Sequence, residues 1–173
     1  NPEECLETNI QGTVNMLECA RLAGVRRFVN SSTSSLYGLK NNPPLEETMP
    51  TDCLNHYSAS KRAAEIMCQM YYNLYGLRTV TLRYFNVYGN RQPLKGIYAP
   101  VVGLFLEQNK AGKPLTVVGD GEQRRDFTHV SDVVEANMDA MMCNFSGIEI
   151  NIGTGKNTSV NELADMIGGE IEY

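Results

Sequence analysis

The sequence is poor in the residues that build metal sites and disulfide frameworks. It has two histidines, His56 and His129, which are too few for a zinc cluster. Its five cysteines are odd in number, scattered along the chain, and include no Cys-x-x-Cys pair. Such cysteines are typical of free thiols in a reducing compartment. We therefore expect neither a metal site nor a disulfide.

Long apolar runs and an excess of basic residues are also missing. No apolar run approaches the roughly 18 residues of a membrane-spanning helix. The chain has 15 Lys and Arg against 20 Asp and Glu, a net charge of −5, which argues against nucleic acid or an anionic membrane as a general partner. A soluble cytoplasmic protein is the default expectation. The 173 residues, 42% of them hydrophobic, suit one globular domain with a sizeable core.

A glycine-rich dinucleotide fingerprint is absent as well. Gly153-Thr154-Gly155 lacks the third glycine and the following strand and acidic residue of that motif, so it does not match the fingerprint. The chain begins Asn1-Pro2-Glu3-Glu4, a helix start with an N-cap, a proline and acids in the first turn. We therefore expect a fragment of a longer protein, cut upstream and, because the tail 170–173 resembles a strand, downstream too.

Hydrophobic periodicity predicts alternating helices and strands. Helices are expected at 2–23, 56–76, 98–111, 131–143 and 158–167, and strands at 25–31, 77–85, 115–118, 124–128 and 149–152. The turn Gly119-Asp120-Gly121 predicts that 115–118 and 124–128 form a hairpin. Alternation of this kind indicates an α/β fold. We therefore expect a parallel sheet with helices packed on it.

Tyr57 and Lys61 are four residues apart at the start of the predicted helix 56–76, which places both side chains on one face. A free tyrosine has a pKa of about 10, so a tyrosine that serves as a base near pH 7 needs about 4 kcal/mol of stabilisation of its anion. An ammonium about 5 Å away supplies roughly 3 kcal/mol at an effective dielectric of 20. A second positive charge, such as an oxidised nicotinamide, could supply the rest.

Two further motifs lie at the ends of predicted strands. Residues 27–38 read as a strand that runs into a hydroxyl-rich turn, and residues 83–89, Arg-Tyr-Phe-Asn-Val-Tyr-Gly, end a second strand. Hydroxyls at the carboxyl end of a strand face the crevice where open α/β sheets bind ligands. Serine and threonine also cap turns, which accounts for several of the five hydroxyls in 31–35.

Together with Tyr57 and Lys61, these motifs resemble the extended short-chain dehydrogenase/reductase superfamily, and within it the nucleotide-sugar epimerase/dehydratase family. The resemblance covers essentially the whole chain. It implies a partial Rossmann-type, doubly wound parallel sheet in 1–90 and a small substrate lobe in 91–173, from which segments can return to the sheet. The family carries a turn similar to Asn-Ile-Gly-Thr-Gly in that lobe, which implies that 151–155 is a structural turn. The resemblance also implies NAD as cofactor, a UDP-sugar as the expected substrate, and the activity of an NAD-dependent nucleotide-sugar 4-epimerase. By analogy with the family, the helices at 2–23 and 57–76 would pair into a homodimer.

The resemblance also assigns roles to individual residues. Tyr57 would be the base, Lys61 would favour its phenolate and bind the nicotinamide ribose, and Thr33, with Ser32 or Ser34 as substitutes, would bind the sugar hydroxyl. Phe85 would lie near the nicotinamide. The family places an asparagine and an arginine on the substrate's diphosphate at the positions of Asn86 and Arg125, whereas for Arg124 we prefer a surface pair with a carboxylate.

Asn9 has two readings. In the context Asn-x-x-Gly-Thr, the family has an asparagine near the cofactor; the second reading is an asparagine that bonds the backbone of a neighbouring strand, and the two are compatible.

Alternative functions stay open. A 4,6-dehydratase would need an Asp-Glu pair directly after Thr33, but the sequence has Ser34 and Ser35 there. Reductases and decarboxylases of the same family are further alternatives, and a non-catalytic relative or an inactive fragment is one of another class.

Overall fold

The chain folds into two compact units. The computed structural model describes residues 1–94 and 100–173. The first unit combines residues 1–84 with 134–152, and the second combines 85–133 with 153–173. No helix in the described ranges is both long and apolar enough to cross a membrane.

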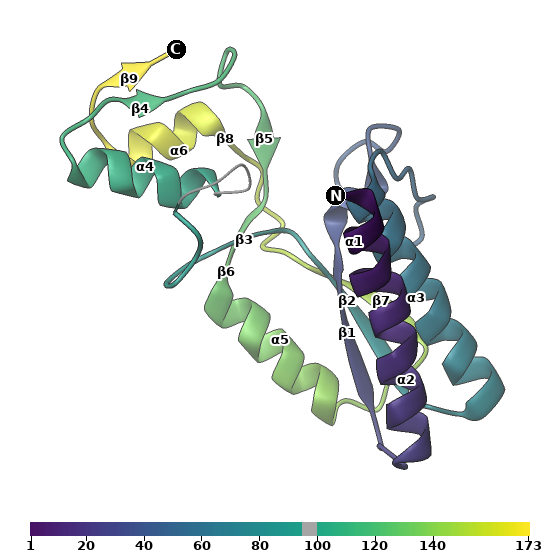
Figure 1. The fold of residues 1–173 in the computed structure, drawn as a ribbon. Helices are drawn as coiled ribbons and strands as arrows, with labels where there is room; N and C mark the ends of the chain where they lie inside the picture. The colour runs from purple at the N-terminus through teal and green to yellow at the C-terminus, as the bar shows by residue number, and fades with distance from the viewer. Residues whose placement is uncertain (95–99) are drawn as a thin grey trace. The chain divides into compact units, whose positions relative to one another are not determined.

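A parallel three-stranded sheet forms the centre of the first unit (Figure 1). Its strands, in the order β1-β2-β7, are β1 (Phe28–Thr33), β2 (Thr79–Tyr84) and β7 (Ile148–Ile152). In the register, Val80 of β2 lies opposite Val29 of β1 and Ile148 of β7. Residues Thr79 to Arg83 are buried, so β2 is covered on both faces although its sequence alternates.

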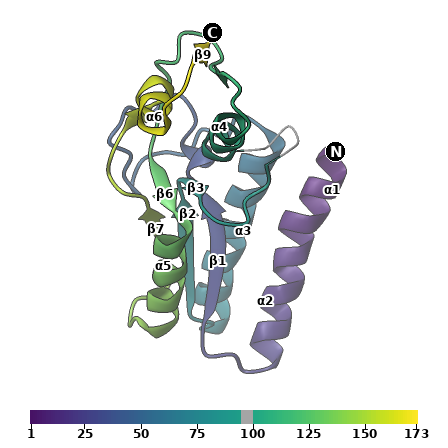
Figure 2. The same cartoon turned by 90° about the vertical axis from the view of Figure 1, so that its left-hand side faces the viewer.

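Helices cover both faces of this sheet (Figure 2). On one face, α1 (Pro2–Leu6), the π-helical turn η1 (Glu7–Gln11) and α2 (Gly12–Leu22) form a continuous rod beside α3 (His56–Tyr75). Leu17, Cys68 and Tyr71 pack between them. On the other face, Ala140 of α5 (Val130–Met142) packs against Val80. The sheet is therefore the middle layer of three.

Capping residues fix the ends of α3. The Asn55 side chain accepts from the Ser58 N–H at 2.9 Å, and the Asn55 N–H donates to the Ser58 hydroxyl at 3.3 Å, which forms a capping box. At the other end, Gly76 takes the left-handed conformation, φ 69°. The N-cap predicted at Asn1 is confirmed too, because its side chain accepts from the Glu3 N–H.

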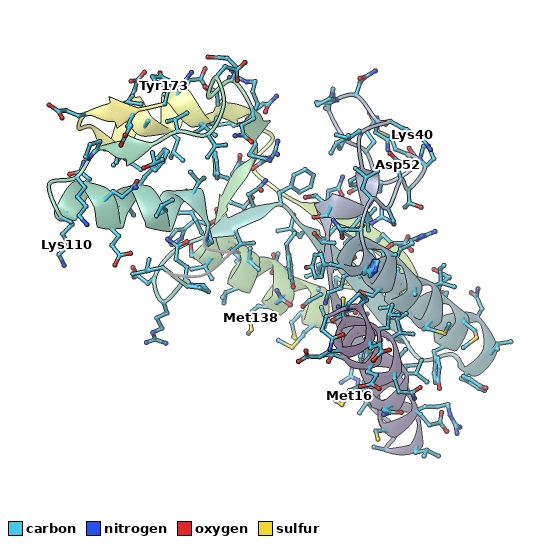
Figure 3. All side chains as sticks on the ribbon, turned by 45° about the horizontal axis from the view of Figure 1, so that its top comes forward. Met16, Lys40, Asp52, Lys110, Met138 and Tyr173 are labelled. Atoms are coloured by element: carbon cyan, nitrogen blue, oxygen red, sulfur yellow. The ribbon has the colours of Figure 1, made fainter. Side chains whose placement is uncertain are left out.

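A 3₁₀ turn and a long loop follow β1. The turn η2 (Ser34–Tyr37) ends at Gly38, whose φ is 62°. The Asp52 carboxylate accepts from the N–H groups of Leu39 and Lys40 and pairs with the Lys40 ammonium at 3.1 Å. Figure 3 shows Lys40 and Asp52 side by side in this loop. A Cβ at position 38 would overlap the Asp52 backbone oxygen, so the loop closes directly over this glycine.

The second unit consists of short strands and two helices. Its core includes Phe105, Leu115, Val117 and Leu163. The elements are β3 (Asn86–Tyr88), α4 (Val101–Lys110), β4 (Leu115–Thr116), β5 (Arg124–Arg125), β6 (Phe127–His129), β8 (Thr158–Ser159), α6 (Val160–Ile167) and β9 (Ile171–Glu172). The predicted start of α4 at Tyr98 lies outside the described residues.

The predicted hairpin at 115–128 is wrong. β4 pairs in parallel with β9, β5 pairs antiparallel with β8, and β6 pairs in parallel with β3. Each strand near the Gly119-Asp120-Gly121 turn therefore finds a partner distant in sequence. The three strands form their hydrogen bonds with β9, β8 and β3 instead of with each other. The two glycines of the turn, Gly119 and Gly121, nevertheless have positive φ.

Candidate active site

Tyr57 and Lys61 lie together on α3, facing the end of β1. Tyr57 is in the first helical turn and its side chain is accessible, at 45% exposure. The Lys61 Nζ lies 6.0 Å from the centroid of the Tyr57 ring and donates to the Ser31 carbonyl oxygen at 3.1 Å. Burial lowers the pKa of Lys61, and the neighbouring Cys5 opposes that shift. A fixed cation thus lies beside an accessible phenol.

The residues at the end of β1 divide between two environments. Thr33 is the N-cap of η2: its hydroxyl accepts from the Ser35 N–H at 3.2 Å and donates to the Ser35 hydroxyl at 3.0 Å. Ser34, the first residue of η2, is partly buried. The Ser32 side chain points to the opposite side of the strand, where it is buried and donates to Glu65 at 2.6 Å.

Asn9 bonds a helix and not a strand. It lies in the π-helical turn η1, and its Nδ2 donates to the Ser60 hydroxyl at 3.0 Å and to the Cys5 sulfur at 3.5 Å. The Ser60 hydroxyl in turn donates to the Tyr57 carbonyl oxygen at 2.8 Å. The alternative that Asn9 bonds strand backbone is therefore wrong. Its amide is linked through Ser60 to the turn of α3 that carries Tyr57.

Sequence reasoning missed a buried ion pair behind this site. Glu65 follows Lys61 by one turn of α3, and its side chain is inaccessible to solvent. Burial raises the pKa of Glu65, but hydrogen bonds from Arg83 and Ser32 outweigh it, and the net pKa is below the ordinary range. For Arg83, burial acts to lower the pKa, but the hydrogen bond to Glu65 outweighs burial, and the net pKa is above the ordinary range. The sequence did carry a signal for Glu65: it follows Tyr57 and Lys61 at the same interval of four residues, which places all three on one helix face.

Asn86 and Arg125 belong to the second unit. The backbone N–H and the side-chain Nδ2 of Asn86 both donate to the Asp126 carbonyl oxygen at 3.1 Å. The Arg125 guanidinium is exposed and donates to the Arg124 carbonyl oxygen at 2.7 Å. Phe85 is partly buried, and a Cβ at Gly153 would lie 3.2 Å from its ring.

A pocket of about 300 Å³ brings Asn86 and Arg125 together. Both residues line it within the second unit. Its other walls are predominantly apolar: Val87, Tyr88, Pro100, Val101, Val102, Leu104, Thr116, Val118, Gln123, Phe127 and Val160. One guanidinium and one amide on an apolar cavity suit a ligand with an anionic group and a flat apolar portion.

The Gly-Thr-Gly turn has a structural contact, as the resemblance implied. The Asp126 carboxylate accepts from the N–H groups of Thr154 and Gly155 at 3.0 and 2.8 Å, and from the Thr154 hydroxyl at 2.8 Å. The surface pairing preferred for Arg124 is also confirmed, by an ion pair with Glu162 at 2.8 Å.

Comparison with known proteins identifies close relatives. Residues 1–153 match the profile of the NAD dependent epimerase/dehydratase family. A UDP-glucose 4-epimerase of Mycolicibacterium smegmatis is 42% identical over 164 residues, which are 94% of this chain and 52% of the relative. The chain thus spans about half the length of the curated relatives it matches.

Solved structures agree with this match. A Thermotoga maritima UDP-glucose 4-epimerase, solved with UDP-glucose, superposes with a TM-score of 0.92 at 37% identity, over 96% of this chain and 54% of that one. A Thermus thermophilus UDP-glucose 4-epimerase, solved with NAD, superposes with a TM-score of 0.85 at 35% identity, over 96% and 57%. The first unit thus has the parallel sheet of Rossmann-fold epimerases.

Proposed function

Because the chain belongs to the NAD dependent epimerase/dehydratase family, we propose that the whole protein that contains it is a 4-epimerase of a nucleotide-sugar, with a UDP-sugar as substrate. The carrying observation is the accessible Tyr57 phenol with the Lys61 ammonium held beside it at the end of β1. Family relatives that act on UDP-glucose support the substrate class.

NAD is the cofactor of this family, and Lys61 fits the part of it that this chain would hold. An ammonium has three N–H donors, and the Ser31 carbonyl takes one of them, which leaves donors for the ribose hydroxyls. Tyr57, Phe85 and Asn9 are proposed to lie toward the nicotinamide end. The sequence contains no glycine-rich fingerprint, so the pyrophosphate would be bound by residues outside this chain.

The chemistry of this chain's residues is proton transfer at the sugar 4-hydroxyl. Tyr57, as phenolate, takes that proton and later returns it. The Lys61 charge stabilises the phenolate, and Thr33 orients the hydroxyl. Bound NAD supplies a hydride acceptor and donor for C4. Asn86 and Arg125 would hold the diphosphate, and Ser34 remains a proposed substrate contact. We leave Ser32 out, because its buried hydroxyl bonds Glu65.

Elimination of water is disfavoured by the residues of η2. Ser34 and Ser35 occupy the positions at which a dehydratase would need two carboxyl groups. Hydroxyls do not supply that acid–base pair near neutral pH. The backbone N–H and the hydroxyl of Ser35 are both bonded to Thr33, which gives this residue a part in the turn.

A homodimer is part of the proposal. Apolar side chains are exposed on the outer faces of α2 and α3, among them Met16, Leu22, Ile66 and Leu74. Figure 3 labels Met16 on its helix. Sedimentation of the whole protein would give the oligomeric state.

The test is turnover of the whole protein with UDP-glucose and UDP-galactose. We expect interconversion of the C4 epimers, followed by chromatographic separation of the two sugars, and no loss of water, followed by mass spectrometry. Tyr57→Phe should lower kcat at least 10²-fold with little change in substrate affinity, because positioned proton transfer typically contributes 10²–10⁴-fold. A 4-keto-6-deoxy product would favour the dehydratase, and absence of turnover would favour a non-catalytic relative.

A further inference from the structure

A buried carboxylate extends the helix face that carries the proposed catalytic pair. Tyr57, Lys61 and Glu65 follow one another at intervals of four residues along α3, so their side chains lie on one face. Tyr57 is exposed, Lys61 is partly buried, and the Glu65 side chain has no accessible surface. A charge in that position must be compensated by partners within the fold.

Four donors saturate the Glu65 carboxylate. Arg83 of β2 forms a two-pronged contact, Nε to Oε1 at 3.0 Å and Nη2 to Oε2 at 2.9 Å. Ser32 of β1 donates to Oε1 at 2.6 Å, and Arg62 of α3 donates to Oε2 at 2.8 Å. Because a two-pronged arginine contact fixes orientation as well as distance, the Glu65–Arg83 pair fixes α3 against β2, and the Ser32 hydrogen bond joins α3 to β1.

The same guanidinium reaches the turn that carries Thr33. Its Nη1 donates to the Tyr37 hydroxyl at 2.9 Å and to the Glu47 carbonyl oxygen at 3.2 Å. Tyr37 is the last residue of η2, the turn that Thr33 caps, and its hydroxyl donates to Asn151 of β7 at 2.7 Å. One buried network therefore connects the helix of Tyr57 and Lys61 to the turn of Thr33.

Stability alone is a poor explanation for this network. Replacing a buried ion pair by apolar residues of similar volume is often neutral or stabilising, because desolvation of the charges offsets their attraction. The specific effect of the two-pronged contact is geometrical, since it allows one relative placement of α3, β2 and η2.

We propose that Glu65 and Arg83 are positioning residues, which hold the α3 face of Tyr57 and Lys61 in register with the η2 turn of Thr33. The proposal rests on the proposed function for its catalytic readout. The geometrical part concerns only the first unit and can be measured without turnover.

The main variant of the whole protein is Glu65→Leu with Arg83→Met, which removes both charges together. Its matched control is Glu18→Leu with Arg21→Met, which removes a partly exposed Glu–Arg pair of α2. We expect both variants to unfold within about 5 °C of the unaltered protein. In the Glu65/Arg83 variant we expect kcat to fall at least tenfold while KM changes less than threefold, and in the control neither should change beyond threefold.

Amide hydrogen exchange gives the readout that does not need activity. In the Glu65/Arg83 variant we expect the amides of residues 34–38 to exchange at least tenfold faster, and in the control to exchange as in the unaltered protein. If the double variant fails to fold, Arg83→Lys replaces it, because lysine keeps the charge but lacks the fork; the same two changes are expected there.

The outcomes separate the two proposals. If the unaltered protein has no epimerase activity, the proposed function is overturned. The rate of amide hydrogen exchange of residues 34–38 in the Glu65/Arg83 variant then still decides the positioning role. If the unaltered protein is active and Tyr57→Phe is not, a folded Glu65/Arg83 variant with normal kcat and normal exchange overturns the inference. Loss of stability without a change in kcat per folded molecule overturns it as well.

Discussion

Replacing Lys61 by methionine tests the electrostatic part of the proposed mechanism. Methionine keeps an unbranched side chain of similar length but loses the charge. With the 6.0 Å between Nζ and the Tyr57 ring centroid as the separation, an ammonium contributes about 3 kcal/mol to a phenolate at an effective dielectric of 20. This energy corresponds to about a 100-fold change in rate. We therefore expect kcat at pH 7 to fall about 100-fold in the whole protein.

The pH dependence of the Lys61→Met variant distinguishes this effect from loss of folding. Because burial lowers the pKa of Lys61, the unaltered protein loses this cation as pH rises, so the deficit of the variant should shrink from pH 7 toward 9.5. Lys113→Met, at an exposed position in the second unit, is the control and should keep normal activity. Steady-state kinetics across this pH range with circular dichroism of each variant make the measurement. A Lys61→Met enzyme within threefold of the unaltered one at pH 7 would refute the reasoning.

Three other predictions concern stability and cofactor affinity. Gly38→Ala should lower the free energy of unfolding by at least about 2 kcal/mol, because the strain of a positive φ adds to overlap with Asp52. Gly24→Ala is the control, with φ 66° and open space around the position, and it should lower the free energy of unfolding less in the same urea titration. Equal losses of stability would contradict the overlap. Burial raises the pKa of Cys68 from 9.0 to about 12. The folded pKa is above the unfolded one, so this contribution to stability is present below pH 9 and is lost as pH rises from 9 toward 12; the stability of the unaltered protein relative to Cys68→Ala should fall over that range, and a constant difference in urea unfolding would contradict the assignment. Finally, the isolated chain 1–173, titrated with NAD in a calorimeter, should bind NAD with a dissociation constant in the millimolar range, about −4 kcal/mol, and should show no turnover. Micromolar affinity together with epimerisation would contradict our view that the main NAD contacts lie outside this chain.

Local signals in the sequence were sufficient to predict α3 and α6. Asn55 with Ser58 and Gly76 mark the ends of α3, and Ser159 with Glu162 starts α6 through a capping box, because caps act within a few residues of the helix they end. The π-helical turn within the first helix was not predicted. Its hydrophobic pattern resembles that of an α-helix, and one altered turn leaves no clear trace in it.

Pairings between distant segments could not be read from local patterns. The strands at 115–118 and 124–128 suggested a hairpin, but their partners lie at 86–88, 158–159 and 171–172. Ser32 was a possible substitute for Thr33, but its hydroxyl is buried against Glu65, a carboxylate that lies 33 residues away in the sequence. The burial of Arg83 was likewise not predicted, because the burial of an arginine depends on a partner that sequence periodicity does not reveal.

The discontinuous first unit has a consequence for synthesis of the chain. β2 pairs with β7 from Val80 to Ile148, so one edge of β2 has no partner until 68 more residues have been translated. At about 5–20 residues per second this delay is roughly 3–14 s. During that time the ribosome-bound chain exposes the unpaired backbone N–H and C=O groups of one edge of β2, and residues 85–133 of the second unit emerge before the first unit is complete. Nascent chains stalled between 85 and 147 are therefore the ones that should depend most on a chaperone.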